Sequence, residues 1–231
     1  MGAIFDWLAQ LMGSGLRVFF DWTNSYGIAI ILLVVAIRVI MIPLTMSQIR
    51  STMRMQALQP ELTALQKKYR NDPQKLNQEM MELYRRNKVN PFAGCLPTLL
   101  QLPFFVALFR LLENPGAYMA GDLATKPFLG MDLTKVPGPA PHGAGSIAYV
   151  LPLLNVLTMY WQMRISTPRT GTAQDQQTLI MTITMPLLIG WMSMSFPAGL
   201  TLYWVVSNLF GVVQQYVTPR PRLVAKGDVQ S

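Results

Sequence analysis

A single arginine interrupts an otherwise uncharged apolar stretch near the start of the chain. Between Asp21 and Arg50 the only charged side chain is Arg38, which lies within the run IAIILLVVAIRVIMIPL. On a helix rising about 1.5 Å per residue, Arg38 would lie roughly 18 Å from Arg50, near the centre of a hydrocarbon layer about 30 Å thick. Exposure to lipid there is costly, so we expect Arg38 to face water or polar groups inside a bundle. It is therefore a candidate functional residue.

The composition indicates one folding unit in a membrane. Hydrophobic residues make up 51% of the chain and charged residues 13%, unlike a typical soluble domain. Cys95 and His142 are the single cysteine and histidine, so the sequence offers no zinc or redox motif. Motifs for nucleotide binding and for the familiar hydrolytic reactions are also absent. We expect no enzymatic activity, no metal and no cofactor.

Uncharged stretches predict an all-α fold with five transmembrane helices. Residues 176–219 hold 44 positions without a charge, too many for one crossing of about 20 residues, and residues 196–199 supply a turn near the middle. Prolines within the spans predict kinked helices, because neighbouring helices in a bundle can satisfy the freed carbonyls. The predicted spans cover residues 27–48, 91–112, 147–164, 177–195 and 198–218.

Basic residues predict which side of the membrane each connection occupies. Segments 50–90, 164–175 and 220–231 fall on one side and hold nine, two and three Lys or Arg residues. The opposite side has Arg17, Lys126 and Lys135 beside five acids. The basic-rich side is cytoplasmic by the positive-inside rule. The N-terminus and the 113–146 loop are then outside, whereas the 165–176 loop and a basic tail, 219–231, are inside.

The first 26 residues predict an amphipathic helix in the outer membrane interface. An apolar face is interrupted by a small-residue stretch, 13–15, and an interfacial amphipathic helix fits the segment best. The segment has neither the basic region nor the cleavage site of a secretory signal. Its apolar face consists of Ile4, Phe5, Leu8, Leu11 and Met12.

Residues 49–90 predict a cytoplasmic helical hairpin. Apolar residues recur at three- and four-residue spacing on both sides of residues 71–73, where a capping residue precedes a proline. Two interpretations remain open: a solvated hairpin whose charges only set topology, or a surface that recruits a nascent chain, the ribosome or lipid headgroups. The basic residues of this recruitment hairpin are Arg50, Arg54, Lys67, Lys68, Arg70, Arg85 and Arg86.

Polar side chains form stripes along three of the predicted spans. Each amide taken alone is better explained by interhelical hydrogen bonding, but a set that converges on Arg38 favours a hydrated groove. The stripe residues are Gln101 in the second span, Asn155, Thr158 and Gln162 in the third, and Thr201, Trp204, Asn208 and Gln215 in the fifth.

Methionines in the fourth span, among them Met181 and Met185, could form an adaptable apolar surface, although ordinary packing is the better single explanation.

Several sequence elements together resemble the YidC/Oxa/Alb family of membrane protein insertases. QPEL, NP-x-x-GCLP and PAGL-x-LYW-x-x-SN are the specific elements, and the likeness covers residues 27–217. The resemblance implies five helices around a cytoplasm-open hydrophilic groove with Arg38 inside it, and insertion without nucleotide hydrolysis. It further implies a groove lined by Trp204, Asn155, Thr158 and Asn208, and a hydrophobic slide that includes Met181 and Met185.

The resemblance also implies a bacterial plasma membrane location and a likeness to the shorter Gram-positive form. Nascent membrane proteins and the lipid bilayer are the implied partners; the ribosome, the Sec translocon and the signal recognition particle receptor stay open, and no direct DNA binding is expected.

Two other functions remain possible from the residues alone. A channel or secondary transporter would also use polar residues within the membrane, but Arg38 has no intramembrane acid to couple with and no repeat is evident. A purely structural membrane scaffold would treat Arg38 as replaceable.

Overall fold

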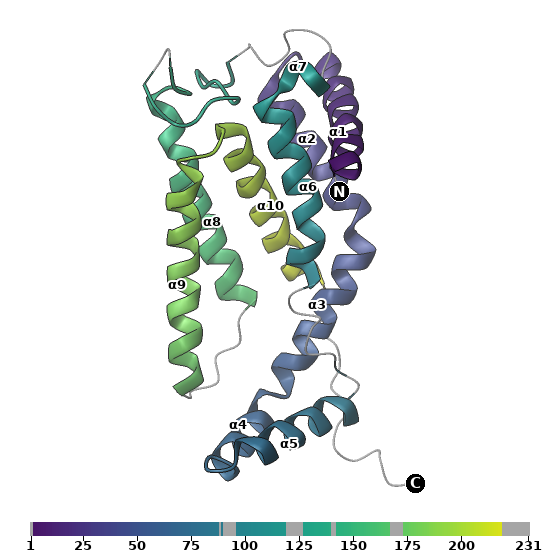
Figure 1. Ribbon diagram of the computed structural model, residues 1–231, viewed down its shortest axis with the longest axis vertical. Coiled ribbons are helices and arrows are strands. Elements are labelled where there is room, and N and C mark those ends of the chain that lie inside the picture. The colour runs from purple at the N-terminus through teal and green to yellow at the C-terminus, as the bar shows by residue number, and fades with distance from the viewer. Residues whose placement is uncertain are drawn as a thin grey trace.

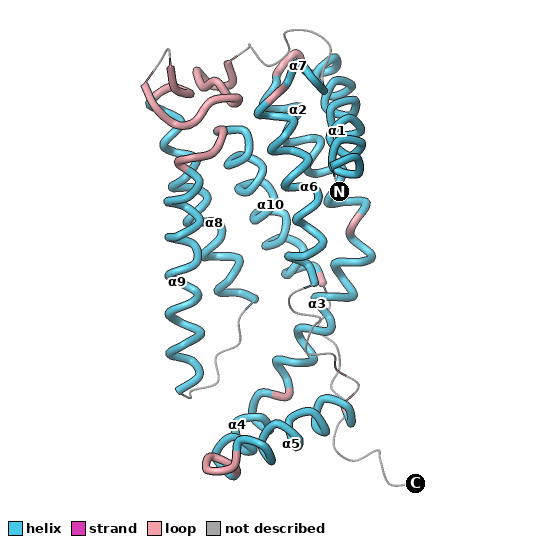
Figure 2. Tube along the Cα trace, in the orientation of Figure 1, coloured by secondary structure: helices cyan, strands magenta, loops and turns pink. Residues whose placement is uncertain are grey.

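The structure is a computed structural model that describes residues 2–87, 89, 96–118, 127–139, 142–166 and 173–218. Within these ranges the chain is helical, and its only strand-like pairings are two isolated bridges, Phe128 with Met131 and Gly138 with Gly145. The predicted all-α fold is confirmed. Figure 2 shows that loops gather mainly at one end of the molecule.

The larger part of the molecule is a bundle of helices that lie side by side (Figure 1). Helix α10 occupies a central position because it packs against α2 on one side and α8 on the other. Helix α9 packs on α8, and α1 packs on α2 and α6. The bundle helices are α1 (Gly2–Thr23), α2 (Tyr26–Ile40), α6 (Leu96–Glu113), α8 (Val150–Ser166), α9 (Ala173–Ser193) and α10 (Ala198–Val217).

The predicted first span is two helices rather than one. Helix α2 ends at Ile40, and α3 (Ile42–Ala57) continues at an angle of 65° to it. Pro43 lies in the first turn of α3 and lacks the N–H that would bond to the carbonyl of Val39. The kink predicted from the prolines is confirmed here.

The described helices differ in how well they would cross a bilayer. By length and hydropathy, no single described helix qualifies as a membrane span, whereas α2 and α3 taken together do. The stretch Ile180–Ser193 of α9 is a shorter apolar helix. The count of five crossings therefore stays a prediction. The predicted turn between the fourth and fifth spans is confirmed as a break, since α9 ends at Ser193 and α10 begins at Ala198.

Helix α1 runs without a break through Gly13 and Gly15, which belong to the small-residue stretch that interrupts its predicted apolar face. A side chain at Gly13 would lie only 2.6 Å from the carbonyl oxygen of Tyr118, so the glycine allows the chain after α6 to approach closely. The side of α1 that packs into the bundle consists of Ala9, Met12, Leu16 and Phe20, whereas Ile4 and Leu11 of the predicted apolar face are exposed.

The loop before α8 covers the end of the bundle at which α10 begins. Ala198 N donates to the carbonyl of Lys135, and Gly199 N donates to that of Leu133, both at 2.8 Å. These bonds satisfy backbone donors at the helix N-terminus, which have no partner within the helix. Leu133 is itself 1% exposed, so this loop contributes to the apolar core. Helix α7 (Pro115–Tyr118) lies at the same end, and a 3-10 helix, Ser146–Tyr149, leads into α8.

The predicted hairpin is a pair of helices, α4 (Gln59–Lys68) and α5 (Pro73–Arg86), at the opposite end from α7 (Figure 1), and its cytoplasmic location stays a prediction. Asp72 caps α5, because its carboxylate accepts a 3.0 Å hydrogen bond from Lys75 N, and Pro73 occupies the first helical position. The hairpin has a small core of its own, made of Leu58, Leu62 and Val89 with Met55, Met80, Leu83 and Tyr84 packed against it.

Candidate functional site: the polar interior of the bundle

Arg38 lies in the last turn of α2 and is partly buried. Within the described part of the chain its guanidinium makes no hydrogen bond or ion pair; its electrostatic neighbour is the hydroxyl of Tyr203 on α10. Tyr203 and Ser207, one turn further along α10, are 2% and 3% exposed, and neither hydroxyl makes a well-formed hydrogen bond. The cation therefore faces polar groups without being neutralised by a described acid.

A second polar group joins α8 to α10. The side-chain amide of Asn208 donates to Asn155 Oδ1 at 3.1 Å and to Thr158 Oγ1 at 3.3 Å. The Thr158 hydroxyl in turn donates to the carbonyl of Leu154 at 2.7 Å. Three residues predicted to line the groove thus lie together but bond to one another, which matches the interhelical interpretation. Only Asn155 Nδ2 is left buried without a partner.

Other predicted groove residues have separate surroundings. Gln162 on α8 lies against Gly211 of α10, where a Cβ would overlap the amide at the end of the flexible Gln162 side chain. Thr201 is fully buried and donates to the carbonyl of Ser193 at 3.4 Å, which ties α10 to the end of α9. Gln101 on α6 is partly buried and joins neither polar group.

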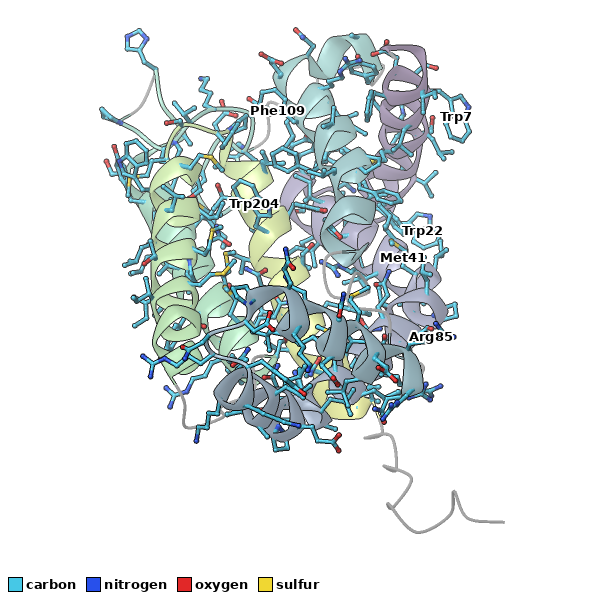
Figure 3. All side chains as sticks on the ribbon, turned by 60° about the horizontal axis from the view of Figure 1, so that its bottom comes forward. Trp7, Trp22, Met41, Arg85, Phe109 and Trp204 are labelled. Carbon is cyan, nitrogen blue, oxygen red and sulfur yellow. The ribbon has the colours of Figure 1, made fainter. Side chains whose placement is uncertain are left out.

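Trp204 belongs to a cluster of four aromatic rings between α6 and α10. Its ring stacks on Phe105 with a centroid distance of 5.4 Å and an interplanar angle of 15°. Phe196 packs edge-on against Trp204 at 5.9 Å and against Phe109 at 5.6 Å. Figure 3 labels Phe109 and Trp204. The indole therefore contributes mainly to helix packing near the start of α10.

The half of the interior nearer the hairpin is joined by glutamines that the sequence interpretation did not single out. Gln214 of α10 donates to Thr45 of α3, and Gln56 of α3 donates to the carbonyl of Ser166 at the end of α8. Gln214, rather than the predicted Gln215, is the buried member of the pair on α10. The sequence contained a signal for these glutamines, because polar residues also recur at three- and four-residue spacing along α3.

The remaining predicted residues are on the outside of the molecule. Met181 and Met185 are 54% and 37% exposed on α9. The seven basic residues of the recruitment hairpin are all exposed, and Arg86 forms a 2.5 Å ion pair with Glu82. Figure 3 shows Arg85 at the surface of the hairpin. No group of acidic, histidine or cysteine side chains in the described ranges has the arrangement of a metal site.

The chain is similar to known proteins along most of its length. It matches the family described as 60Kd inner membrane protein over residues 18–225. "Membrane protein insertase YidC" of Caldanaerobacter subterraneus subsp. tengcongensis is 37% identical over 221 residues, which cover 96% of this chain and 98% of that protein. The protein of the same name from Syntrophobacter fumaroxidans is 38% identical over 92% of this chain, but this chain spans only 38% of its length.

A solved structure shares the fold. It is described as the active YidC insertase with its first transmembrane domain resolved, and it has a TM-score of 0.65 and 28% sequence identity to this chain. The match covers 93% of this chain and 47% of that one. The helical arrangement in Figure 1 is thus similar to that of a known insertase.

Proposed function

Because the chain belongs to the YidC/Oxa/Alb family of membrane protein insertases, we propose that it inserts nascent membrane proteins into the bacterial plasma membrane and helps them to fold. The observation that most directly supports the proposal is the environment of Arg38. A guanidinium within an apolar helix, beside buried hydroxyls and without a described acidic partner, is available to an incoming charge.

The proposed site is a groove that opens to the cytoplasm and the lipid. The hydrophilic flank of a substrate enters it, and Arg38 with the polar groups of α8 and α10 takes the place of water around that flank. Hydration of the groove shortens the apolar distance that the flank must cross. The hydrophobic segment that follows contributes a favourable transfer term as it enters lipid, so the cycle requires no nucleotide hydrolysis.

The proposed topology has five membrane crossings with the N-terminus outside and the C-terminus inside. The crossings correspond to α2 with α3, α6, α8, α9 and α10. Helix α1 packs lengthwise along α2 and α6 rather than across the end of the bundle, so we propose that its exposed side, which includes Trp7 and Trp22, contacts lipid. Figure 3 shows both tryptophans on the outer side of α1.

Two further surfaces complete the proposal. The exposed Met181 and Met185 of α9 form part of an apolar slide along which the substrate helix reaches lipid, because unbranched methionines adapt to varied partners. The exposed cations of the recruitment hairpin attract the nascent chain or its carrier. The ribosome, the Sec translocon and the signal recognition particle receptor are proposed as partners of that surface.

Proteoliposomes test the proposal. Arg38→Ala is expected to slow insertion of a single-span protein with an acidic N-terminal tail by about tenfold or more, since a charge-assisted hydrogen bond contributes about 1.5–3 kcal/mol. Arg38→Lys is the matched control and should retain most activity if charge rather than guanidinium geometry is required. Unchanged insertion by Arg38→Ala would contradict the electrostatic role, and ion flux without substrate would favour a channel.

A further inference from the structure

Helix α3 carries a polar face that continues the interior toward the cytoplasm. Gln214 of α10 donates to Thr45 at one end of this face. The carbonyl of Ser166, at the end of α8, accepts from Gln56 at the other end. The face therefore looks toward the C-terminal ends of both helices, which is the side from which a substrate would arrive. Its members, spaced by three or four residues, are Thr45, Gln48, Thr52 and Gln56.

Gln48 differs from the two ends of this face because its amide is unused. The residue is 4% exposed, and neither Nε2 nor Oε1 has a hydrogen-bonding partner in the described part of the protein. By contrast, Thr45 bonds to the carbonyls of Met41 and Ile42 as well as to Gln214. A buried polar group without a partner normally costs stability, so a retained one calls for a functional explanation.

The chemistry of the amide indicates what it can bind. A glutamine side chain presents a carbonyl acceptor and two N–H donors and carries no charge. These groups complement the N–H and C=O of a peptide backbone, which every substrate has whatever its side chains. Arg38, in contrast, favours acidic groups, so the two residues would discriminate between substrates in different ways.

We propose that the substrate's hydrophilic flank, on entering the cytoplasmic end of the groove, displaces the side chains that cover Gln48, and that the Gln48 amide then binds the peptide backbone of the flank. This inference rests on the proposed insertase function and deepens it. Gln48 acts as a site for the backbone that is independent of sequence, while Arg38 favours acidic flanks. An insertase with both residues can accept tails of varied sequence.

The test compares Gln48→Met with the unaltered protein in proteoliposomes, using single-span substrates with acidic, neutral and basic tails. Insertion is expected to slow by about 2- to 10-fold for all three tails, which corresponds to one or two lost hydrogen bonds. The melting temperature should be unchanged or higher, because methionine has a similar shape and leaves no unpaired polar atom. Gln10→Met, the same change at an exposed position of α1, is the matched control and should have no effect.

A substrate-side change makes the assignment specific to the backbone. Replacing single backbone amides of the flank by esters removes an N–H donor without altering any side chain. At one position of the flank, the ester substitution is expected to slow insertion by the unaltered protein but not insertion by the Gln48→Met variant. Equal insertion by Gln48→Met and the unaltered protein, or a defect confined to one tail charge, would overturn the proposal.

Two further experiments distinguish the role of Gln48 from the proposed insertase function on which it rests. If Gln48→Met does not fold, a photoreactive residue in the flank of the substrate can be used with the unaltered protein. Cross-links within residues 45–56 are expected, and their absence would overturn the proposal. If Gln48→Met inserts substrates slowly and Arg38→Ala inserts them normally, only the role of Arg38 is rejected. If Arg38→Ala is slow and Gln48→Met is normal, only the role of Gln48 is rejected.

Discussion

Arg110 near the end of α6 forms a 2.5 Å ion pair with Asp6 of α1. The hydroxyl of Tyr118 on α7 donates to the same carboxylate oxygen at 2.9 Å, so one acid joins three helices. The hydrogen bond from Tyr118 and the one from Arg110 lower the pKa of Asp6, and its bond to Asp6 raises the pKa of Tyr118. An arginine on the predicted outer side, against the positive-inside trend, has here an acidic partner.

The Asp6–Arg110 pair is expected to hold α1 against α6. Asp6→Arg or Arg110→Asp alone should loosen α1, because each places like charges together, and the double exchange should restore part of the contact. The pKa of Asp6 is lowered in the folded protein. Its contribution to stability is therefore present at pH values above 3.8, the ordinary pKa, and is lost as the pH falls below that value. Proteolysis of α1 across a pH series, with Asp6→Asn as the pH-independent control, measures this. Equal protease sensitivity of all variants would contradict it.

Close contact between α8 and α9 depends on Gly190. A Cβ at this position would overlap Cγ2 of Val156 on α8, a short side chain that cannot move far. Gly190→Ala is expected to destabilise the protein by about 1–3 kcal/mol, as overpacking does, despite the better helix propensity of alanine. Thermal unfolding in detergent measures the loss. Val156→Ala should rescue Gly190→Ala, and an equally unstable double variant would show that another contact is responsible.

The amide of Asn208 is expected to stabilise the contact of α8 with α10. Asn208→Leu leaves Asn155 Oδ1 buried without a donor, at a cost of about 1–3 kcal/mol. The double variant Asn155→Leu/Asn208→Leu should lose less than the sum of the single changes, because no unpaired acceptor remains. A thermodynamic cycle from chemical unfolding measures the coupling. Strict additivity would mean that the hydrogen bond contributes little.

Asp72 is expected to stabilise the recruitment hairpin without affecting the bundle. Its carboxylate caps α5, so Asp72→Ala should cost about 0.5–2 kcal/mol of hairpin stability, and Asp72→Asn should retain most of the effect. The hairpin has its own small core, which is why the loss should stay local. Hydrogen exchange of residues 59–86 measures it. Faster exchange throughout α8 and α10 would contradict a local effect.

Sequence periodicity predicted the elements that depend on local signals. The Asp72-Pro73 boundary of the hairpin and the break before Ala198 lie where the sequence indicated, because capping and chain reversal depend on a few neighbouring residues. A helix was also predicted for the N-terminal segment, but the close packing at its small residues was not. Gly13 is a helix breaker by propensity, but here its missing side chain makes room for the backbone of Tyr118.

The site was predicted in composition but not in pairing. The sequence identified Asn155, Thr158 and Asn208 as polar residues in apolar segments, and they do lie together. It could not indicate that they bond mainly to one another, or that Trp204 stacks on Phe105. Such pairings depend on how neighbouring helices are rotated and displaced, which periodicity within one helix does not specify.

From the amino-acid sequence alone it follows that this chain is a set of apolar helices with one cation in an apolar run and a basic hairpin. Charge placement and hydrophobic period are local properties, and a one-dimensional pattern is enough to express them. Helix packing, in contrast, determines that Arg38 lies near Tyr203, that Asn208 is already paired and that the amide of Gln48 is not. A hydrogen bond requires two groups to meet within about 3 Å, and for residues far apart in the chain that meeting is set by helix packing.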